Sequence, residues 1–184
     1  AIEITAPIHV SALQPEVLMI TGAEMKAKLL TLSGAHYILN HHEPFALDAG
    51  DRIELSAPRA GRVAYLARRG GFDGERVLGS ASSDTLSGIG PQPLAAPSIL
   101  HAAQMVQGAV IPSLPVPVLP SAGDEIVLSL LPGPRMDWFT DAAIAALLNT
   151  TWKISTEITR VGLRLDGPSL PRKITGELAS EVVL

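Results

Sequence analysis

Short apolar segments separated by glycine turns are the feature that most constrains the fold of this chain. They are clearest in PFALDAGDRIELSAPRAGRVAYLARRGG, residues 44–71, where Ile53 and Leu55 lie on one face of a predicted strand. Three apolar residues alternate in the same way in the next predicted strand, namely Val63, Tyr65 and Ala67. The glycines of DAGD and APRAG supply the positive φ of the intervening turns. Residues 1–99 are therefore predicted to form a β lobe.

A proline-rich stretch divides the chain. IPSLPVPVLPSAG lies within residues 100–123, which we expect to be an extended, semi-rigid connector. Residues 124–184 then form a second β lobe, which is predicted to open with a strand in DEIVLSLLPGP. A short helix is predicted before the connector in SILHAAQMVQ, residues 98–107. The predicted fold class is thus mainly β with a few short helices.

The second lobe contains the helix with the clearest signals, FTDAAIAALLNTTW. Thr140 can cap its N-terminus, Asp141 suits the positive end of its dipole, and its Ala and Leu content favours the helical state. From Trp152 to Asp166 the pattern predicts a return to strand. The chain begins at Ala1 without Met and ends on GELASEVVL, so we expect a piece of a longer sequence and an incomplete second lobe.

Composition excludes several classes of function. Apolar residues make up 47% and charged residues 17% of the 184 residues, which indicates a globular protein. The net charge is −4 and no basic cluster exceeds Arg68-Arg69, so nucleic-acid binding is not expected. The apolar runs are too short to span a bilayer. The absence of cysteine rules out disulfides and a thiol nucleophile, and it fits a cytoplasmic location.

Two arginines, Arg160 and Arg164, flank Gly162 in an alternating segment. If residues 159–166 form one strand, both guanidiniums project from the same face, about 13 Å apart at roughly 3.3 Å per residue. Val161, Leu163 and Leu165 would then face the core.

This arrangement has two interpretations. The guanidiniums can bind a carboxylate, carbamate or phosphate over the bare glycine. Alternatively the face is solvated and Arg164 pairs with Asp166 or Glu157, which residue types alone favour.

A glycine- and serine-rich stretch, GFDGERVLGSASSDTLSGIG, has no useful periodicity and is predicted to be a long loop, residues 71–90. Loops of this length are commonly functional, so it is a candidate site. Its serines Ser80, Ser82 and Ser83 have no neighbouring histidine and no GxSxG context. Residue types therefore favour turn-forming serines over a nucleophile.

Motifs for metal and nucleotide binding are weak or missing. In NHHEP, His41, His42 and Glu43 are adjacent, so on a strand they point to opposite faces, and no metal is predicted. The sequence has no GxxxxGK[ST] loop and no GxGxxG after a strand. Any ATP site would therefore be non-standard or belong to a partner.

Several segments, taken together and in order, resemble one family. They are IEIT, ITGA, LDAGDRIEL and GRVAYLARRGGFDGERVLGSASSD in the first half, then Gly133-Pro134-Arg135 with Asp137 and Phe139, residues 160–167 (RVGLRLDG), and Ser180-Glu181. This pattern resembles the middle portion of the biotin-dependent carboxyltransferase family, also called allophanate hydrolase subunit 2. Three positions depart from that pattern, namely Ala81, Thr159 and Val161, and the family's opening and C-terminal motifs are absent from this sequence.

The resemblance implies cyclophilin-like β-barrel lobes and an enzyme subunit that needs companion subunits. Its members include the C subunit of ATP-dependent 5-oxoprolinase, which implies opening of 5-oxoproline to glutamate; carboxyl transfer from carboxybiotin to urea is the alternative. ATP is expected at the level of the complex. Biotin, if used, would sit on a separate carrier, because no Met-Lys-Met segment occurs. A non-catalytic module that binds a kinase-inhibitor-type subunit is a further alternative.

The resemblance also suggests where a small amide or carboxylate substrate binds. Substrate-binding roles fall to Arg160, Arg164, Gly79, Ser80, Ser82 and Ser83. Supporting roles fall to Gly162, Asp166, Ser180 and Glu181. No general base can be assigned.

Overall fold

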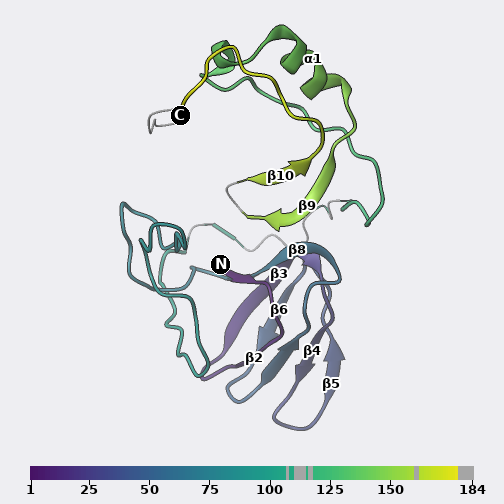
Figure 1. Cartoon of the computed structure of the whole chain (residues 1–184). Helices are drawn as coiled ribbons and strands as arrows, with labels where there is room; N and C mark the ends of the chain where they lie inside the picture. Colours follow the sequence, from purple (N-terminus) through teal and green to yellow (C-terminus); the bar gives the residue numbers. More distant parts are fainter. Residues whose placement is uncertain (107, 110–114, 116–117, 160–161, 178–184) are drawn as a thin grey trace. The chain divides into compact units, whose positions relative to one another are not determined.

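The computed structural model describes residues 1–106, 108–109, 115, 118–159 and 162–177. The chain divides into two compact units, Ala1–Ile126 and Val127–Leu184, which are described separately (Figure 1). All strand pairs are antiparallel, and the mainly β class predicted from the sequence is confirmed.

The first unit consists of two four-stranded sheets, with strand orders β1-β8-β3-β6 and β2-β7-β4-β5 (Figure 1). The strands are β1 (Ile2–Ile4), β2 (Ile8–Ser11), β3 (Glu16–Glu24), β4 (Ala27–Leu30), β5 (His36–Ile38), β6 (Pro44–Leu47), β7 (Arg52–Leu55) and β8 (Ala60–Arg68). Each sheet keeps two edge strands, so the described strands form open sheets and not a closed barrel.

Apolar residues from both sheets form one core. Ile53 and Leu55 of β7 are 0% and 2% exposed, which confirms the predicted inward face of that strand. In β8 the core face is the other one, because Ala64 and Leu66 are fully buried. The remaining members of the core are Ile4, Ala12, Leu18, Ile20, Ala23, Met25, Ala27, Leu29 and Leu47. Burial of each Leu or Ile side chain stabilises the fold by roughly 1.5–3 kcal/mol.

The two sheets are joined at a corner. β3 continues into β4, and β7 into β8, while the backbone bonds Ser56 N–H to Lys26 O (2.9 Å) and Arg59 N–H to Glu24 O (2.7 Å) hold the paired strands together through the bend. The register of β3 on β8 shifts between Gly22 and Glu24. Gly22 has φ +85°, and a Cβ there would lie 2.7 Å from Val63 O, so only glycine fits this approach.

The second unit contains a 3-10 turn η1 (Met136–Trp138), helix α1 (Asp141–Asn149) and a hairpin of β9 (Lys153–Ile158) and β10 (Leu163–Asp166). Thr140 caps α1 as predicted, since its Oγ1 accepts from Ala143 N–H at 3.1 Å. Trp152 Nε1–H donates to Leu147 O at 2.9 Å. Among the described residues, no helix has the length and apolar character needed to cross a membrane.

Three local predictions were wrong. Residues 98–106 are not helical, because the backbone of His101 and Ala103 bonds to the segment at Gly71 and Asp73 instead. Residues 124–134 form no strand, since no described strand pairs with them. Residues 159–166 are not one strand: β10 begins only at Leu163.

The predicted inward face of β10 was also wrong. Leu163 and Leu165 are 47% and 37% exposed. The hairpin is a sheet of only two strands, and all four residues of β10 are exposed. Val161 lies outside the described residues.

A buried carboxylate organises one end of the first unit. Asp51 is 5% exposed, and its two oxygens accept from the backbone N–H of Leu32 (3.0 Å) and Asp48 (2.9 Å). Its own carbonyl accepts from Ala12 N–H at 2.9 Å. Asp51 therefore ties the segments after β2 and β4 to the β6–β7 turn.

We expect Asp51→Asn to lower the free energy of unfolding by about 1–3 kcal/mol. The amide nitrogen of asparagine would face a backbone N–H that now donates to a carboxylate oxygen of Asp51. Urea denaturation measures this. Asp48→Asn is the matched control in the same turn, where the side chain is exposed, and it should change stability by less than about 0.5 kcal/mol. Equal effects of both substitutions would contradict the account.

Candidate functional site

A long loop of the first unit is closed at its base by paired backbone segments. Phe72 and Ala102 form an antiparallel bridge. Asp73 N–H donates to His101 O at 2.8 Å, and Ala103 N–H donates to Gly71 O at 3.0 Å. We call residues 71–73 and 101–103 the loop neck, and residues 74–100 the neck loop. The loop predicted from the glycines and serines thus exists and has a defined base.

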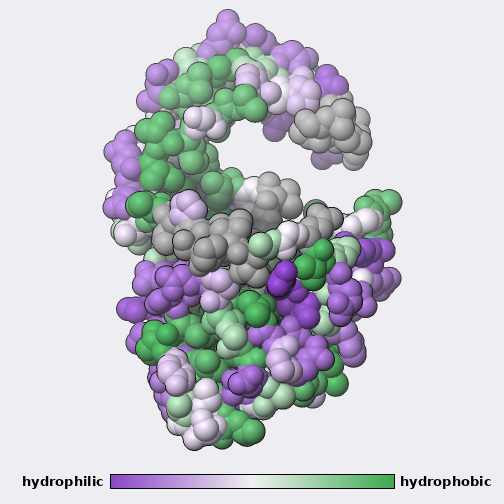
Figure 2. All heavy atoms as spheres, turned by 180° about the vertical axis from the view of Figure 1, so that it is seen from behind, coloured by the Kyte–Doolittle hydropathy of each residue, from purple (hydrophilic) through white to green (hydrophobic). Residues whose placement is uncertain are grey.

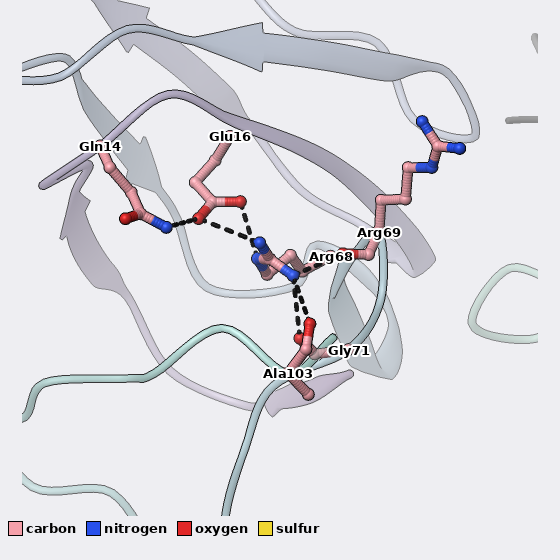
Figure 3. Close-up of polar contacts among 6 residues, drawn as sticks. All are labelled: Gln14, Glu16, Arg68, Arg69, Gly71 and Ala103. Carbon is pink, nitrogen blue, oxygen red and sulfur yellow. Dashed lines mark hydrogen bonds and ion pairs between the residues drawn. The ribbon is translucent and has the colours of Figure 1, made fainter. Parts of the chain in front are cut away.

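The Arg68 side chain lies at the loop neck and contacts five acceptor atoms (Figure 3). Its Nε–H donates to Glu16 Oε2 at 2.7 Å and its Nη2 to Glu16 Oε1 at 3.2 Å. Its Nη1 donates to three carbonyl oxygens, those of Arg69 (2.6 Å), Gly71 (3.3 Å) and Ala103 (2.9 Å). Arg68 ends β8 and Glu16 begins β3, so two neighbouring strands of one sheet place this pair.

The Glu16–Arg68 pair is largely shielded from water. The two side chains are 16% and 13% exposed. Burial acts to raise the pKa of Glu16, but hydrogen bonds from Gln14 and Arg68 and the charge of Arg68 outweigh it, so the pKa lies below its ordinary value. The contribution of the pair is therefore complete at neutral pH and is lost only as the pH falls through that lowered pKa. Because its donors are engaged by protein oxygens, Arg68 is poorly suited to bind an anionic ligand.

The predicted site residues of the neck loop are engaged in turns. Leu78 and Gly79 both have positive φ, and Val77 and Ser80 exchange backbone hydrogen bonds of 2.9 and 3.0 Å. Ser80 Oγ accepts from Ser82 N–H at 3.1 Å, and Ser83 Oγ–H donates to Pro91 O. The structure thus brings Gly79, Ser80, Ser82 and Ser83 together on one loop, with hydrogen bonds that stabilise its turns.

A second turn of the neck loop is built on Asp84. Hydrogen bonds from the Ser87 hydroxyl and from the backbone N–H of Leu86 hold the pKa of Asp84 below its ordinary value. Asp84 N–H also donates to Ile89 O at 2.8 Å. The loop therefore carries its own internal hydrogen bonds beyond those of the neck.

Arg164 lies on the exposed β9–β10 hairpin of the second unit. Its Nη1 donates to Glu157 Oε2, and both side chains are about two-thirds exposed, at 69% and 67%. This is the ion pair that the alternative interpretation describes. The Glu157 hydrogen bond, and then its charge, raise the pKa of Arg164.

The other predicted residues of this segment are only partly described. Gly162 and Asp166 are exposed, and Asp166 lies opposite Lys153 in the hairpin. Arg160, Ser180 and Glu181 lie outside the described residues. The two-arginine arrangement, and the supporting roles of Ser180 and Glu181, therefore stay predictions.

Sequence reasoning missed the Glu16–Arg68 pair and the groove beside it. The groove is shallow and open, has a volume of about 510 Å³, and is lined by Pro15, Glu16, Val17, Ala46, Leu47, Asp48, Arg68, Arg69, Gln104 and Val106. The Gly70-Gly71 pair after Arg68 is a local signal for close backbone approach. No local signal links Arg68 to Glu16, which is 52 residues away in sequence.

The N-terminus of α1 does not suit the phosphates of ATP. This helix, the one α-helix among the described residues, carries the Thr140 cap and the Asp141 carboxylate at its N-terminus, and that negative charge opposes an anion there. Within the same residues, no group of three or more His, Asp or Glu is arranged to hold a metal ion. His41 is engaged elsewhere, since its Nε2 lies 3.0 Å from Met25 O.

Large apolar side chains reach the surface in both units. Leu78 and Leu86 of the neck loop are 99% and 96% exposed. In the second unit, Val127 and Leu131 are 96% and 94% exposed. Figure 2 shows such hydrophobic patches interrupting the hydrophilic surface. Contiguous apolar surface is typical of partner-binding sites, whereas exposed apolar residues scattered singly are common on any protein surface.

Comparison with known proteins gives relatives that are parts of two different enzymes. The C subunit of the 5-oxoprolinase of Escherichia coli (strain K12) is 31% identical over 145 residues, which cover 75% of this chain and 44% of that protein. The urea amidolyase of Saccharomyces cerevisiae is 28% identical over 163 residues, which cover 83% of this chain and 9% of that protein. The chain thus spans less than half the length of each of these relatives.

Two solved structures have folds similar to that of this chain. A crystal structure of TTHA0988 superposes with a TM-score of 0.70 at 28% identity, covering 92% of this chain and 32% of that chain. The urea amidolyase of K. lactis superposes with a TM-score of 0.65 at 25% identity, covering 92% of this chain and 11% of that chain.

The family predicted from the sequence motifs is confirmed. The family model described as carboxyltransferase domain, subdomain A and B, matches residues 1–184. The chain therefore belongs to the carboxyltransferase domain family.

Proposed function

We propose that this chain is part of a 5-oxoprolinase subunit that opens 5-oxoproline to glutamate together with companion subunits. The observation that carries the proposal is the 31% identity to the C subunit of the Escherichia coli 5-oxoprolinase. The exposed apolar side chains Leu78 and Leu86 support the need for companions, because they are costly to leave in water. A cytoplasmic location stays a prediction.

The proposed reaction breaks the lactam C–N bond of 5-oxoproline. Water adds its oxygen to the lactam carbonyl carbon, the C–N bond breaks, and the nitrogen takes up a proton to become the amino group of glutamate. Hydrolysis of ATP to ADP and phosphate drives this step. Since the sequence has no GxxxxGK[ST] loop and the N-terminus of α1 does not suit phosphates, we propose that ATP binds to a companion subunit.

Each unit carries residues that suit one group of the substrate, and we treat the two sets as separate candidates. In the second unit, the guanidinium of Arg164 suits the substrate carboxylate, because its present partner Glu157 is exposed and can be displaced. In the first unit, residues 79–83 are assigned to the lactam carbonyl, which needs hydrogen-bond donors where negative charge develops. This assignment rests on the resemblance, because Ser80 N–H, Ser82 N–H and the Ser83 hydroxyl already donate within the loop. Arg160 is assigned to the substrate on the resemblance alone.

A second candidate function is carboxyl transfer to urea. The match to urea amidolyase, at a TM-score of 0.65, favours it. In that case biotin on a separate carrier would supply the carboxyl group, and the same arginines would bind the carboxylate. The non-catalytic alternative, a module that binds a kinase-inhibitor-type subunit, is supported only by the exposed apolar residues.

The first test asks which substrate the protein uses. We expect the complete protein, mixed with its companion subunits, to release glutamate from 5-oxoproline only when ATP is present. Coupled assay of glutamate and ADP measures both products. ATP- and bicarbonate-dependent consumption of urea, with no glutamate formed, would replace this proposal by the carboxyltransferase alternative, and inactivity on both substrates would favour the binding module.

The second test separates a substrate-binding Arg164 from a structural one. Arg164→Ala should lower kcat/KM about 10- to 100-fold, because a hydrogen bond to a charged group contributes roughly 1.5–3 kcal/mol. Glu157→Gln leaves the guanidinium in place without its competitor, so KM should stay the same or fall. The matched control is Lys153→Ala, an exposed cation of the same hairpin, which should leave the kinetics unchanged. Similar losses in Arg164→Ala and Glu157→Gln would indicate that only the ion pair matters.

A further inference from the structure

The loop neck depends on one side chain that no motif identifies. Three carbonyl oxygens meet at Nη1 of Arg68, and they belong to both sides of the neck: Arg69 and Gly71 on one side, Ala103 on the other. Three carbonyls that converge without a cation between them would repel one another. The guanidinium therefore joins the two sides of the neck electrostatically as well as by hydrogen bonds.

Glu16 fixes the direction of that guanidinium. Its two oxygens bind Nε and Nη2 in a two-pronged arrangement, which leaves Nη1 aimed at the neck. Glu16 in turn accepts from Gln14 Nε2 at 2.8 Å. The side chain of the neighbouring Arg69 does not take part, since it points away from the cluster and donates a 3.3 Å bond to Gly108 O (Figure 3).

The backbone at the neck is equally constrained. Gly70 has φ +83°, and a Cβ there would lie 2.8 Å from Ala103 O, the oxygen that Arg68 binds at 2.9 Å. Gly71 has a similar φ of +80°, but a Cβ there would meet nothing within 4 Å. The close approach of the two sides of the neck therefore depends on glycine at position 70 and on arginine at position 68.

We propose that Arg68, oriented by Glu16, is a positioning residue that holds the neck loop in the conformation in which residues 79–83 bind substrate. This inference rests on the proposed function, because that function assigns residues 79–83 to the substrate. Arg68 itself does not contact substrate, since its donors are engaged by Glu16 and the neck carbonyls. Arg68 therefore influences substrate binding by holding the neck loop in place.

The test is hydrogen exchange on the full chain, followed amide by amide in the neck and in the sheet. Arg68→Lys keeps a positive charge beside Glu16 but has no planar fork to reach three carbonyls. We expect exchange of the Asp73 and Ala103 amides, which bridge the neck, to speed up about tenfold or more, with no change at Ile20 and Leu66 in the core. Arg69→Lys is the matched control and should leave all four amides unchanged.

Gly70→Ala provides a second route that keeps both charges of the Glu16–Arg68 pair and crowds the neck instead, since the added Cβ would lie 2.8 Å from Ala103 O and 3.2 Å from Arg68 Nη1. It should loosen the same two neck amides by displacing Ala103 O, whereas Gly71→Ala, with similar backbone strain and no contact, should loosen them less. Unchanged neck amides in both Arg68→Lys and Gly70→Ala would overturn the proposal. So would equal acceleration in the core, because that outcome means general destabilisation.

Kinetics of the complete protein with its companion subunits then separate the proposal from the function on which it rests. We expect Arg68→Lys to raise KM for 5-oxoproline more than it lowers kcat, because the binding loop and not the reacting group is disturbed. A loosened neck with unchanged kinetics would overturn the link from the neck to substrate and the assignment of residues 79–83. A wild-type protein inactive on 5-oxoproline would reject the proposed function, while the exchange data would still decide the role of Arg68 at the neck.

Discussion

The loop neck of the first unit depends on Arg68, whose positive charge is balanced almost entirely by oxygen atoms of the protein itself. Arg68 and Glu16 are 13% and 16% exposed, and loss of either partner would leave a poorly hydrated charge behind. A buried ion pair often stabilises a fold no more than apolar residues of the same size would, so the pair is weak evidence for extra stability. The pair matters for the geometry of the neck, because the planar guanidinium donates to a carboxylate and to three carbonyl oxygens at once. An apolar replacement could not satisfy those carbonyls.

The sheets below this cluster make the arrangement possible. β3 and β8 are antiparallel neighbours over most of their length, so the start of β3 and the end of β8 meet at the same end of the sheet. Leu18 and Ile20 of β3 and Leu66 of β8 are buried in the core, which fixes both strands in register. The neck loop therefore leaves a well-packed sheet, and it is held by the backbone bonds of the loop neck, by the Arg68 contacts and by its own turns.

Local signals in the sequence predicted some elements well. The cap at Thr140 and the alternation at Ile53 and Leu55 both act within a few residues, and both are confirmed. In β8 the alternation could not choose a face, because residues 63–67 (VAYLA) are apolar at every position. The helix predicted at residues 98–107 failed because pairing with the neck, a contact distant in sequence, outweighed helix propensity.

The loop that carries the candidate site was predictable from the sequence, but the contacts that hold this loop were not. Glycines and serines marked residues 71–90 as a loop, and the family motifs pointed to residues 79–83. The role of Glu16 could not be predicted from the sequence. Glu16 contacts the loop neck through Arg68, and the pairing of β3 with β8 that brings these two residues together has no local signal in the sequence. Arg164 was correctly linked to Glu157 as one of two partners, because a hairpin brings nearby residues together.

We propose above all that the neck loop, held by Arg68, binds the substrate. A crystal structure of the complete protein with its companion subunits and 5-oxoproline would locate the substrate. We expect the lactam carbonyl to lie within hydrogen-bond distance of residues 79–83, with Arg68 still bound to Glu16 and Ala103. A substrate bound elsewhere, with residues 79–83 facing solvent, would show that the neck loop is not the binding site.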